Sequence, residues 1–337
     1  MNPINHQDDR AEPERNYRVL SLFSGCGGLD LGIEGGFSYL KRFYHRNPFK
    51  IVWANDISES ATATQALNFE DLEVVTGDIA CVLADGANLP AADLVIGGFP
   101  CQDFSLAGKR RGVDSARGRL FMDMSTVLRL VRPQAFLAEN VKGILSWNDG
   151  MAIRWIINEF TEAGYRVDYR LFKMANYGVP QTRERVIIIG VRQDLGLPIY
   201  WPLPTHVARS HGGLPTWRTI YDAIDDIKED RIQRELPNFH YSLTKLKPGA
   251  QGNSVTNARL PGPTISAEHH GNIDFHYELP RRLSVREAAR IQTFPDSFEF
   301  LWSMTDAYRQ IGNAVPPVFA WHLAQSLQKM LSCGQKR

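Results

Sequence analysis

The stretch between Arg18 and Gly190 alternates short apolar runs with segments of helical periodicity, and this alternation limits the possible folds more than any other feature. Each run ends in glycine or polar residues, which is typical of the strands of a parallel sheet. The apolar runs cover 18–23, 49–54, 72–75, 93–96, 134–137, 165–172 and 186–190, and helices are predicted from about Leu29 and over 58–68, 120–131 and 152–163. The alternation predicts an α/β fold with a mainly parallel, doubly wound sheet.

The periodicity weakens after about Gln193. Residues 194–278 are rich in proline, glycine, asparagine and histidine, and aromatic residues such as Trp201, Trp217 and Phe239 could seed a small core. We expect a smaller, irregular, β-rich domain in this segment, with a disordered insertion as the alternative. Helical patterns return at 284–292 and at about 317–331.

Composition limits the class of protein. The chain has 337 residues, is 43% hydrophobic and carries a formal net charge of +1, so nucleic-acid binding would depend on local basic patches. Its four cysteines, at positions 26, 81, 101 and 333, show no pairing that indicates a metal site or a disulfide framework. The N-terminus lacks an apolar signal core, and no run approaches the length of a membrane span. We expect a soluble, cytoplasmic protein that holds no metal.

One of these cysteines stands on a predicted turn. Cys101 lies within Phe-Pro-Cys-Gln, directly after the apolar run 93–96 and two glycines. Open α/β sheets keep their active sites at such strand ends, and the proline restricts the turn. Basic side chains follow at 109, 110, 111, 117 and 119, and positive charge favours the thiolate. Cys101 is therefore a candidate nucleophile, although most free cysteines are small buried residues.

Three other strand ends suggest a cofactor pocket. Residues 22–29 contain Gly25, Gly27 and Gly28 after the first run, where backbone amides could approach a ligand. Asp56 follows the second run and could accept hydrogen bonds from ribose hydroxyls, or it could cap a helix. Asp78 follows the third run and could accept from an adenine amino group, or it could be an exposed loop acid. Because no basic residue for a pyrophosphate follows the glycines, S-adenosylmethionine is favoured over NAD.

Six motifs then resemble those of DNA cytosine carbon-5 methyltransferases, in that family's order and across nearly the whole chain. They are the cofactor loop 23–28, the cysteine loop 98–105, the acidic motif 139–141, the paired-arginine motif 181–186, the helix 282–292 with 294–296, and the closing motif 310–317. One departure is Asp56, where the family often has glutamate.

The resemblance implies a Rossmann-like, S-adenosyl-L-methionine-dependent methyltransferase domain formed by 1–193 and 279–337, with 194–278 as the target-recognition domain. It implies that Cys101 adds to carbon 6 of cytosine and that the carboxyl group of Glu139 acts at ring nitrogen 3. It also implies that Arg183 contacts the carbonyl oxygen of the base and that Arg185 holds a phosphate or supports the loop. The target base would be flipped out of double-stranded DNA.

Further residue roles are implied by the same resemblance. The cofactor-binding residues would be Phe23, Gly25, Cys26, Gly27, Gly28, Asp56, Ile57, Asp78, Ile79, Pro100, Leu120, Asn313, Ala314 and Val315. The DNA-binding residues would be Gln102, Ser105, Lys109, Arg110 and Arg111. Candidates for base readout are Arg209, Arg218, Lys245, Lys247, Asn253 and Asn257, since Arg, Lys and Asn pair with base edges.

The leading interpretation is thus a sequence-specific bacterial DNA methyltransferase, associated with the nucleoid through its substrate. It would be an orphan enzyme or half of a restriction–modification pair, acting as a monomer without a stable complex with a cognate endonuclease. A tRNA cytosine methyltransferase is an alternative, although the Cys-Phe-Thr signature of those relatives is missing here. A catalytically inactive DNA-binding homologue is a second alternative, and an NAD-linked oxidoreductase is the least favoured.

Overall fold

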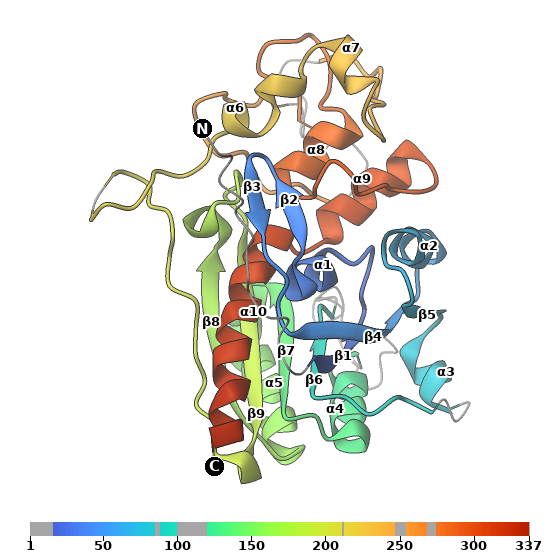
Figure 1. The fold of residues 1–337 in the computed structure, drawn as a ribbon, viewed down its shortest axis with the longest axis vertical. Coiled ribbons are helices and arrows are strands. Elements are labelled where there is room, and N and C mark those ends of the chain that lie inside the picture. Colours follow the sequence, from blue (N-terminus) through green and yellow to red (C-terminus); the bar gives the residue numbers. More distant parts are fainter. Residues whose placement is uncertain are drawn as a thin grey trace, which may run out of the picture.

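A computed structural model describes residues 16–84, 88–99, 120–210, 212–246, 254–267 and 274–336 (Figure 1). Within these residues, seven strands form one sheet in the order β5-β4-β1-β6-β7-β9-β8. The strands are β1 (Tyr17–Leu22), β4 (Phe49–Asp56), β5 (Glu73–Thr76), β6 (Leu94–Gly97), β7 (Ala135–Val141), β8 (Tyr165–Lys173) and β9 (Glu184–Arg192). Each strand matches a predicted apolar run to within a few residues.

The sheet is mainly parallel, as predicted. Strands β5, β4, β1, β6 and β7 all pair in parallel, whereas β9 is antiparallel to both β7 and β8. The order steps outward from β1 in both directions, so the sheet is doubly wound. Ligands in such sheets bind outside the carboxyl ends of the strands, near the point where the order reverses.

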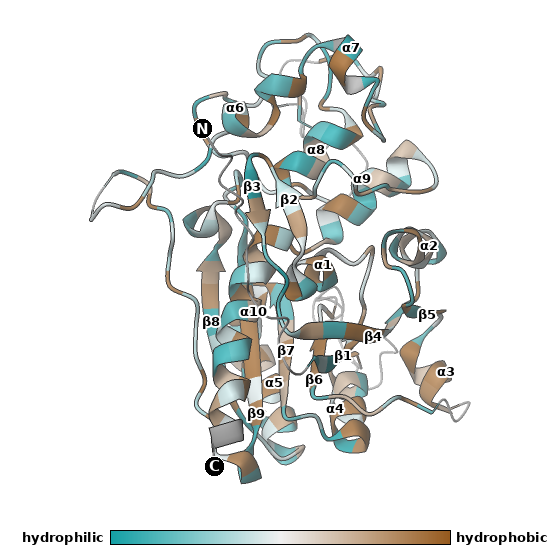
Figure 2. Cartoon of the chain, in the orientation of Figure 1, coloured by the Kyte–Doolittle hydropathy of each residue, from teal (hydrophilic) through white to brown (hydrophobic). Residues whose placement is uncertain are grey.

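Helices cover both faces of the sheet. Along β7, Ala135 and Leu137 face one hydrophobic cluster and Phe136 and Ala138 face the other, as the two-residue period of a strand requires. The first cluster is covered by α1 (Gly28–Glu34) and α10 (Pro317–Ser332), and the second by α4 (Leu120–Val131) and α5 (Met151–Glu162). The brown strands β7 and β9 in Figure 2 show how apolar this central part is.

Further elements surround the carboxyl edge of the sheet. Helices α2 (Glu59–Asn68) and α3 (Ile79–Ala84) follow β4 and β5, and α8 (Val285–Ile291) and α9 (Met304–Asn313) pack together in a third cluster. A hairpin of β2 (Phe37–Tyr39) and β3 (Arg42–Tyr44) follows α1. The sequence pattern did not predict α3, α9 or this hairpin.

The segment 194–278 is irregular where the structure describes it. It contains α6 (Ile220–Ile224) and α7 (Asp230–Gln233), together with isolated bridges such as Val207 with Thr216 and Val255 with Phe275. Regular strands are absent from its described residues, so the β-rich character of this segment remains a prediction. Among the described residues, no helix is both long and apolar enough to cross a bilayer.

Candidate active site

Strand register gathers the predicted site residues at one edge of the sheet. Leu22 at the end of β1 pairs with Asn55 on β4 and with Gly97 on β6, and Gly97 pairs with Ala138 on β7. The residues that follow these positions therefore lie side by side at the carboxyl edge. They are Phe23, Asp56, Gly98 and Glu139, which come from four motifs separated in sequence.

Asp56 anchors the glycine loop to the second strand. One carboxylate oxygen accepts a hydrogen bond from the backbone N–H of Gly25 at 2.8 Å, and the other accepts from the backbone N–H of Ser58 at 2.8 Å. Ser24 adds a backbone hydrogen bond to Asn55. Burial raises the pKa of the Asp56 carboxyl, and these backbone donors counteract the effect. Asp56 thus holds the loop and the start of α2, and its predicted contact with ribose remains a prediction.

The glycines of this loop have different surroundings. Gly25 has a φ of +58° and open space where a side chain would project, so it leaves room for a ligand. A Cβ on Gly27 would lie 2.6 Å from the Phe69 ring, and one on Gly28 would lie 2.7 Å from the carbonyl oxygen of Val315. The loop therefore packs directly against the closing motif from the other end of the chain.

The remaining predicted cofactor residues divide into exposed and buried groups. Ile57 is 72% exposed, and Asp78 is exposed and accepts a hydrogen bond from Ala80 N at the start of α3. Ile79 lies in the core beside α4, and Cys26 is 1% exposed with its Sγ 3.8 Å from the carbonyl oxygen of Gln310. Burial raises the pKa of the Cys26 thiol. Cys26 and Ile79 could therefore reach a ligand only through their backbone.

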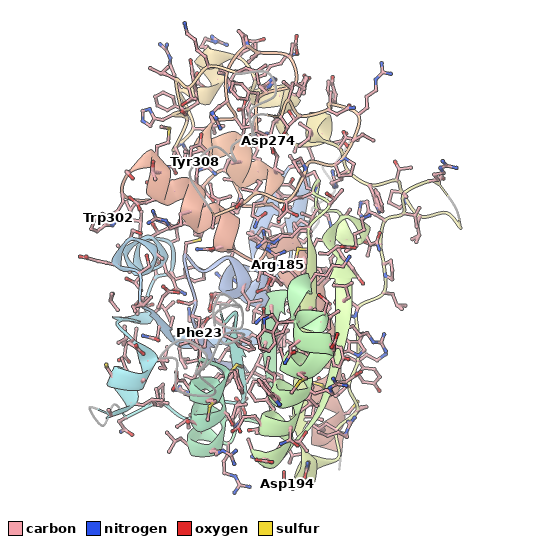
Figure 3. All side chains as sticks on the ribbon, turned by 180° about the vertical axis from the view of Figure 1, so that it is seen from behind. Phe23, Arg185, Asp194, Asp274, Trp302 and Tyr308 are labelled. Carbon is pink, nitrogen blue, oxygen red and sulfur yellow. The ribbon has the colours of Figure 1, made fainter. Side chains whose placement is uncertain are left out.

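The other predicted cofactor residues in the described part of the chain range from exposed to buried. Phe23 adopts a φ of +53° and is half-buried, and Figure 3 shows it in the middle of the molecule, below Arg185. Leu120 is the half-buried first residue of α4, Asn313 is exposed at the end of α9, Ala314 is half-buried and Val315 is buried.

Glu139 stands beside Gly98, the first residue of the cysteine loop motif. It is 8% exposed, and its Oε1 forms an ion pair of 3.0 Å with Arg185 Nε. A Cβ on Gly98 would lie 3.3 Å from Glu139 Oε2, so glycine is the residue that leaves this carboxylate accessible. Asn140 Nδ2 donates to the carbonyl oxygen of Phe99 at 3.0 Å. The acidic motif and the start of the cysteine loop are thereby held together.

Arg183 is a buried cation close to this acid. Its side chain is among the largest fully buried ones, with Nη1 donating to the carbonyl oxygen of Ile265 at 3.3 Å and Nε lacking a hydrogen-bond partner among the described residues. Burial, together with the charge of Arg185, lowers the pKa of Arg183 to about 9, and the charge of Glu139 opposes this fall. Buried donors without partners are costly, so a polar ligand would relieve this arrangement.

Two glutamines, Gln181 and Gln292, connect the paired-arginine motif to the closing motif, although the sequence motifs gave neither of them a role. Gln181 Nε2 donates to Gln292 Oε1 at 2.7 Å, and Gln292 Nε2 donates to the carbonyl oxygen of Ala314 at 2.6 Å. Gln181 Oε1 accepts from the backbone N–H of Ile265 at 3.2 Å. Both residues stand inside quoted motifs and are buried, but their pairing across 111 positions leaves no periodic signal in the sequence.

Several predicted residues lie outside the described part of the chain: Pro100, Cys101, Gln102, Ser105, Lys109, Arg110 and Arg111. Of the readout candidates, Lys247 and Asn253 also lie outside it, Arg209, Lys245 and Asn257 are exposed, and Arg218 is half-buried with a buried Nε. A search of the described residues gave no cluster of three or more histidine, cysteine or acidic side chains suited to a metal ion.

A glycine loop, a buried acid and paired arginines at the carboxyl edge of a doubly wound sheet define a cofactor-binding α/β enzyme. The chain matches the family model "C-5 cytosine-specific DNA methylase" over residues 17–259 and 242–329. It therefore belongs to the C-5 cytosine-specific DNA methylase family and is a DNA cytosine-5-methyltransferase.

Individual relatives agree with this assignment. The chain is 37% identical to the Type II methyltransferase M.NgoFVII of Neisseria gonorrhoeae, covering 94% of this chain and 87% of the relative. It is 33% identical to the Type II methyltransferase M.FnuDI of Fusobacterium nucleatum, covering 95% and 96%. A solved structure of a putative DNA modification methyltransferase encoded within a prophage (E. coli) matches with a TM-score of 0.66 and 25% identity, covering 94% of this chain and all of that one.

Proposed function

We propose that the protein transfers a methyl group from S-adenosyl-L-methionine to carbon 5 of a cytosine flipped out of double-stranded DNA, through a covalent adduct with Cys101. The observation that carries the proposal is that Glu139 lies beside Gly98, three residues before the cysteine, and forms an ion pair with Arg185. Arg183 is close enough to both for their charges to act on its pKa. The match to the cytosine-specific family and the identity to Type II enzymes support the same reaction.

The chemistry uses each group in a distinct role. The thiolate of Cys101 bonds to carbon 6, and the electron pair of the 5,6 double bond becomes available at carbon 5. The carboxyl group of Glu139 interacts with ring nitrogen 3 and stabilises the charge that develops there, and Arg183 donates to the carbonyl oxygen at carbon 2. The bound cofactor supplies an electrophilic methyl group on a sulfonium. Carbon 5 would take this methyl group and leave a neutral thioether behind. Transfer of the carbon-5 proton to solvent water would then restore the 5,6 double bond, as the bond to carbon 6 breaks and Cys101 leaves as a thiolate.

The residues present fit this cofactor. The space beside Gly25 admits a ligand close to backbone N–H groups, and the exposed side chain of Ile57 offers an apolar surface for a base. Asp56 and Asp78 place carboxylates at successive strand ends, where ribose and adenine donors would be recognised. Phe23 and the closing-motif residues Asn313 and Val315 would complete the pocket.

The DNA would be read by the irregular segment 194–278, with 1–193 and 279–337 forming the catalytic unit. Lys109, Arg110 and Arg111 would contact phosphates from the loop after Cys101, joined by Gln102 and Ser105 near the base. We infer a sequence-specific, monomeric bacterial enzyme in the cytoplasm, associated with the nucleoid through DNA and functionally linked to a restriction endonuclease or acting as an orphan.

The test is methyl transfer by the purified protein with labelled cofactor on phage DNA, followed by nucleoside mass spectrometry. The proposal expects 5-methyl-2′-deoxycytidine from the intact enzyme and none from Cys101→Ala, which retains DNA binding. A matched substitution, Cys81→Ala on the surface of α3, should leave transfer unchanged. Methylation of tRNA in place of DNA, or turnover by Cys101→Ala, would overturn the proposal.

A further inference from the structure

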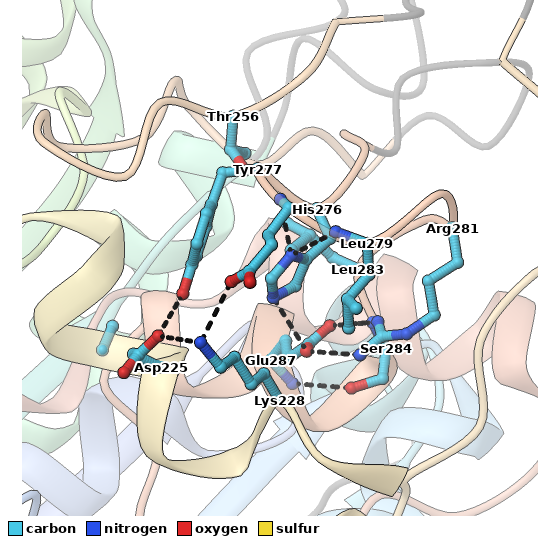
Figure 4. A network of polar contacts seen from close by, with 12 residues as sticks. Asp225, Lys228, Thr256, His276, Tyr277, Leu279, Arg281, Leu283, Ser284 and Glu287 are labelled. Atoms are coloured by element: carbon cyan, nitrogen blue, oxygen red, sulfur yellow. Dashed lines mark hydrogen bonds and ion pairs between the residues drawn. The ribbon is translucent and has the colours of Figure 1, made fainter.

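We propose that His276 and Glu287 are positioning residues that fix the DNA-reading segment relative to the catalytic unit. The inference rests on the proposed function of residues 194–278. Figure 4 shows the network that carries it, which shares no residue with the acid, arginines and glycine loop of the candidate active site. We call the turn 276–281 together with Ser284 and Glu287 the clasp.

The imidazole of His276 organises the turn. Its Nδ1 accepts hydrogen bonds from the backbone N–H groups of Glu278 at 3.0 Å and Leu279 at 3.1 Å. The ring is only 2% exposed, and burial lowers its pKa. A nitrogen that accepts two hydrogen bonds carries no proton, so the neutral imidazole is the form that closes the turn.

Glu287 joins this turn to helix α8. Its carboxylate accepts two hydrogen bonds from the Arg281 guanidinium, at 2.7 and 2.9 Å, and a third from the backbone N–H of Ser284 at 2.7 Å. The same carboxylate lies 3.7 Å from His276 Nε2, which is too far for a hydrogen bond to the neutral imidazole. With an exposed fraction of 0%, Glu287 is held by these partners and the helix cap together.

The other side of the clasp continues into the DNA-reading segment. Phe275 pairs with Val255 and accepts at its carbonyl oxygen from the backbone N–H of Thr256 at 2.9 Å. On the surface, Lys228 forms ion pairs of 3.0 Å with Asp225 and with Glu278. The clasp therefore ties both the 254–256 stretch and the turn after α6 to α8.

Helix α8 connects the clasp to the catalytic unit by packing on α9. Val285, Ala288 and Ala289 pack in one cluster with Ile311 of α9, and α9 ends at Asn313 in the closing motif behind the glycine loop. A change in the clasp would thus shift the DNA-reading segment while leaving the pocket at the sheet edge assembled. A residue that merely stabilised the fold would affect both substrates alike.

The test compares His276→Leu with His276→Asn. Asparagine places a carbonyl oxygen where Nδ1 stands, so it retains the acceptor, whereas leucine removes it. We expect His276→Leu to raise KM for DNA about tenfold or more and to extend methylation to sites that differ by one base. KM for the cofactor, and its affinity by calorimetry, should stay within about twofold. His276→Asn should restore most of the DNA affinity and the selectivity.

A milder variant keeps the inference testable if His276→Leu does not fold. Lys228→Met removes the surface ties to Asp225 and Glu278 and should raise KM for DNA by about threefold at low salt. As pH falls, KM for DNA should rise in the parent enzyme and stay flatter in His276→Asn, since protonation of His276 removes the Nδ1 acceptor. Burial and the like charges of Arg281 and Lys228 oppose this protonation, whereas Glu287 and Glu278 favour it.

Equal changes in the KM for DNA and the KM for the cofactor would overturn the inference. So would an unchanged DNA affinity in variants that are folded and active. A parent enzyme that transfers no methyl group to DNA would instead refute the proposed function, so the two failures are distinguishable.

Discussion

Asp30 provides a quantitative test of the packing behind the glycine loop. It lies in the first turn of α1 and is fully buried, and neither of its carboxyl oxygens has a hydrogen-bond partner among the described residues. Burial is the main reason that the pKa of Asp30 rises from 3.8 to about 7; the nearby Ser21 hydroxyl and the Asp30 backbone oppose the rise, and the charge of Glu34 favours it. The folded protein therefore holds a proton at Asp30 that the unfolded chain releases.

This difference in pKa between the folded and unfolded states sets the sign and size of the change in unfolding free energy with pH. Below pH 4 the carboxyl is neutral in both states, so it imposes no penalty. Between about pH 4 and pH 7 the unfolded chain ionises first, and the free energy of unfolding falls as pH rises through this window. About three pH units at about 1.4 kcal/mol each give an upper limit of about 4 kcal/mol. Asp30→Asn should remove this loss.

The assay is reversible urea denaturation of the parent protein and Asp30→Asn at pH 4.5 and pH 8.5. We expect Asp30→Asn to be more stable by up to about 4 kcal/mol at pH 8.5 and by only about 1 kcal/mol at pH 4.5, where the unfolded carboxyl has just ionised. The control is Asp71→Asn, which makes the same charge change on an exposed residue with a φ of +60° that asparagine tolerates. A difference between Asp30→Asn and the parent that does not vary with pH would refute the reasoning.

Three further outcomes are expected. Arg183→Gln should lower kcat by about 100-fold or more without lowering the unfolding free energy, since it removes a buried charge that has few partners; equal losses in both would contradict its catalytic role. Burial lowers the pKa of His322 to about 4, so the unfolded chain binds the proton first and the protein should lose up to about 3 kcal/mol of stability as pH falls from 6.5 to 4. His322→Gln should reduce this loss, as denaturation at pH 4.5 and 7 would show. Gly28→Ala should destabilise the fold by about 1–3 kcal/mol in thermal unfolding, because its Cβ would meet Val315 and Ala314; an unchanged melting temperature would disprove that contact.

The sheet and its active edge could be predicted because their signals are local. Apolar runs end in polar residues at Asp56, Asp78 and Glu139, and parallel pairing brings such ends together without any further information. The direction of β9 could not be predicted, because an apolar run reads the same in a parallel or an antiparallel neighbour. The hairpin of β2 and β3 has only three residues in each strand, which is too short for a clear period.

The contacts that complete the site could not be predicted from the sequence, for a different reason. Gln181 and Gln292, and likewise Gly28 and Val315, meet only after the chain has closed on itself. Arg218 shows what residue type leaves open: as a basic residue in an irregular segment it suggested base readout, which stays a prediction, and the structure adds that the residue is half-buried with a buried Nε. Charge and residue type indicate what a side chain can bind, and burial decides whether it is available.

The most direct test of the central claim is bisulfite sequencing of a plasmid recovered from methylase-free cells that express this protein. Our account predicts protected cytosines at one short motif with the intact protein and none with Cys101→Ala. Full conversion of all cytosines with soluble intact protein, or protection that persists in Cys101→Ala, would contradict it.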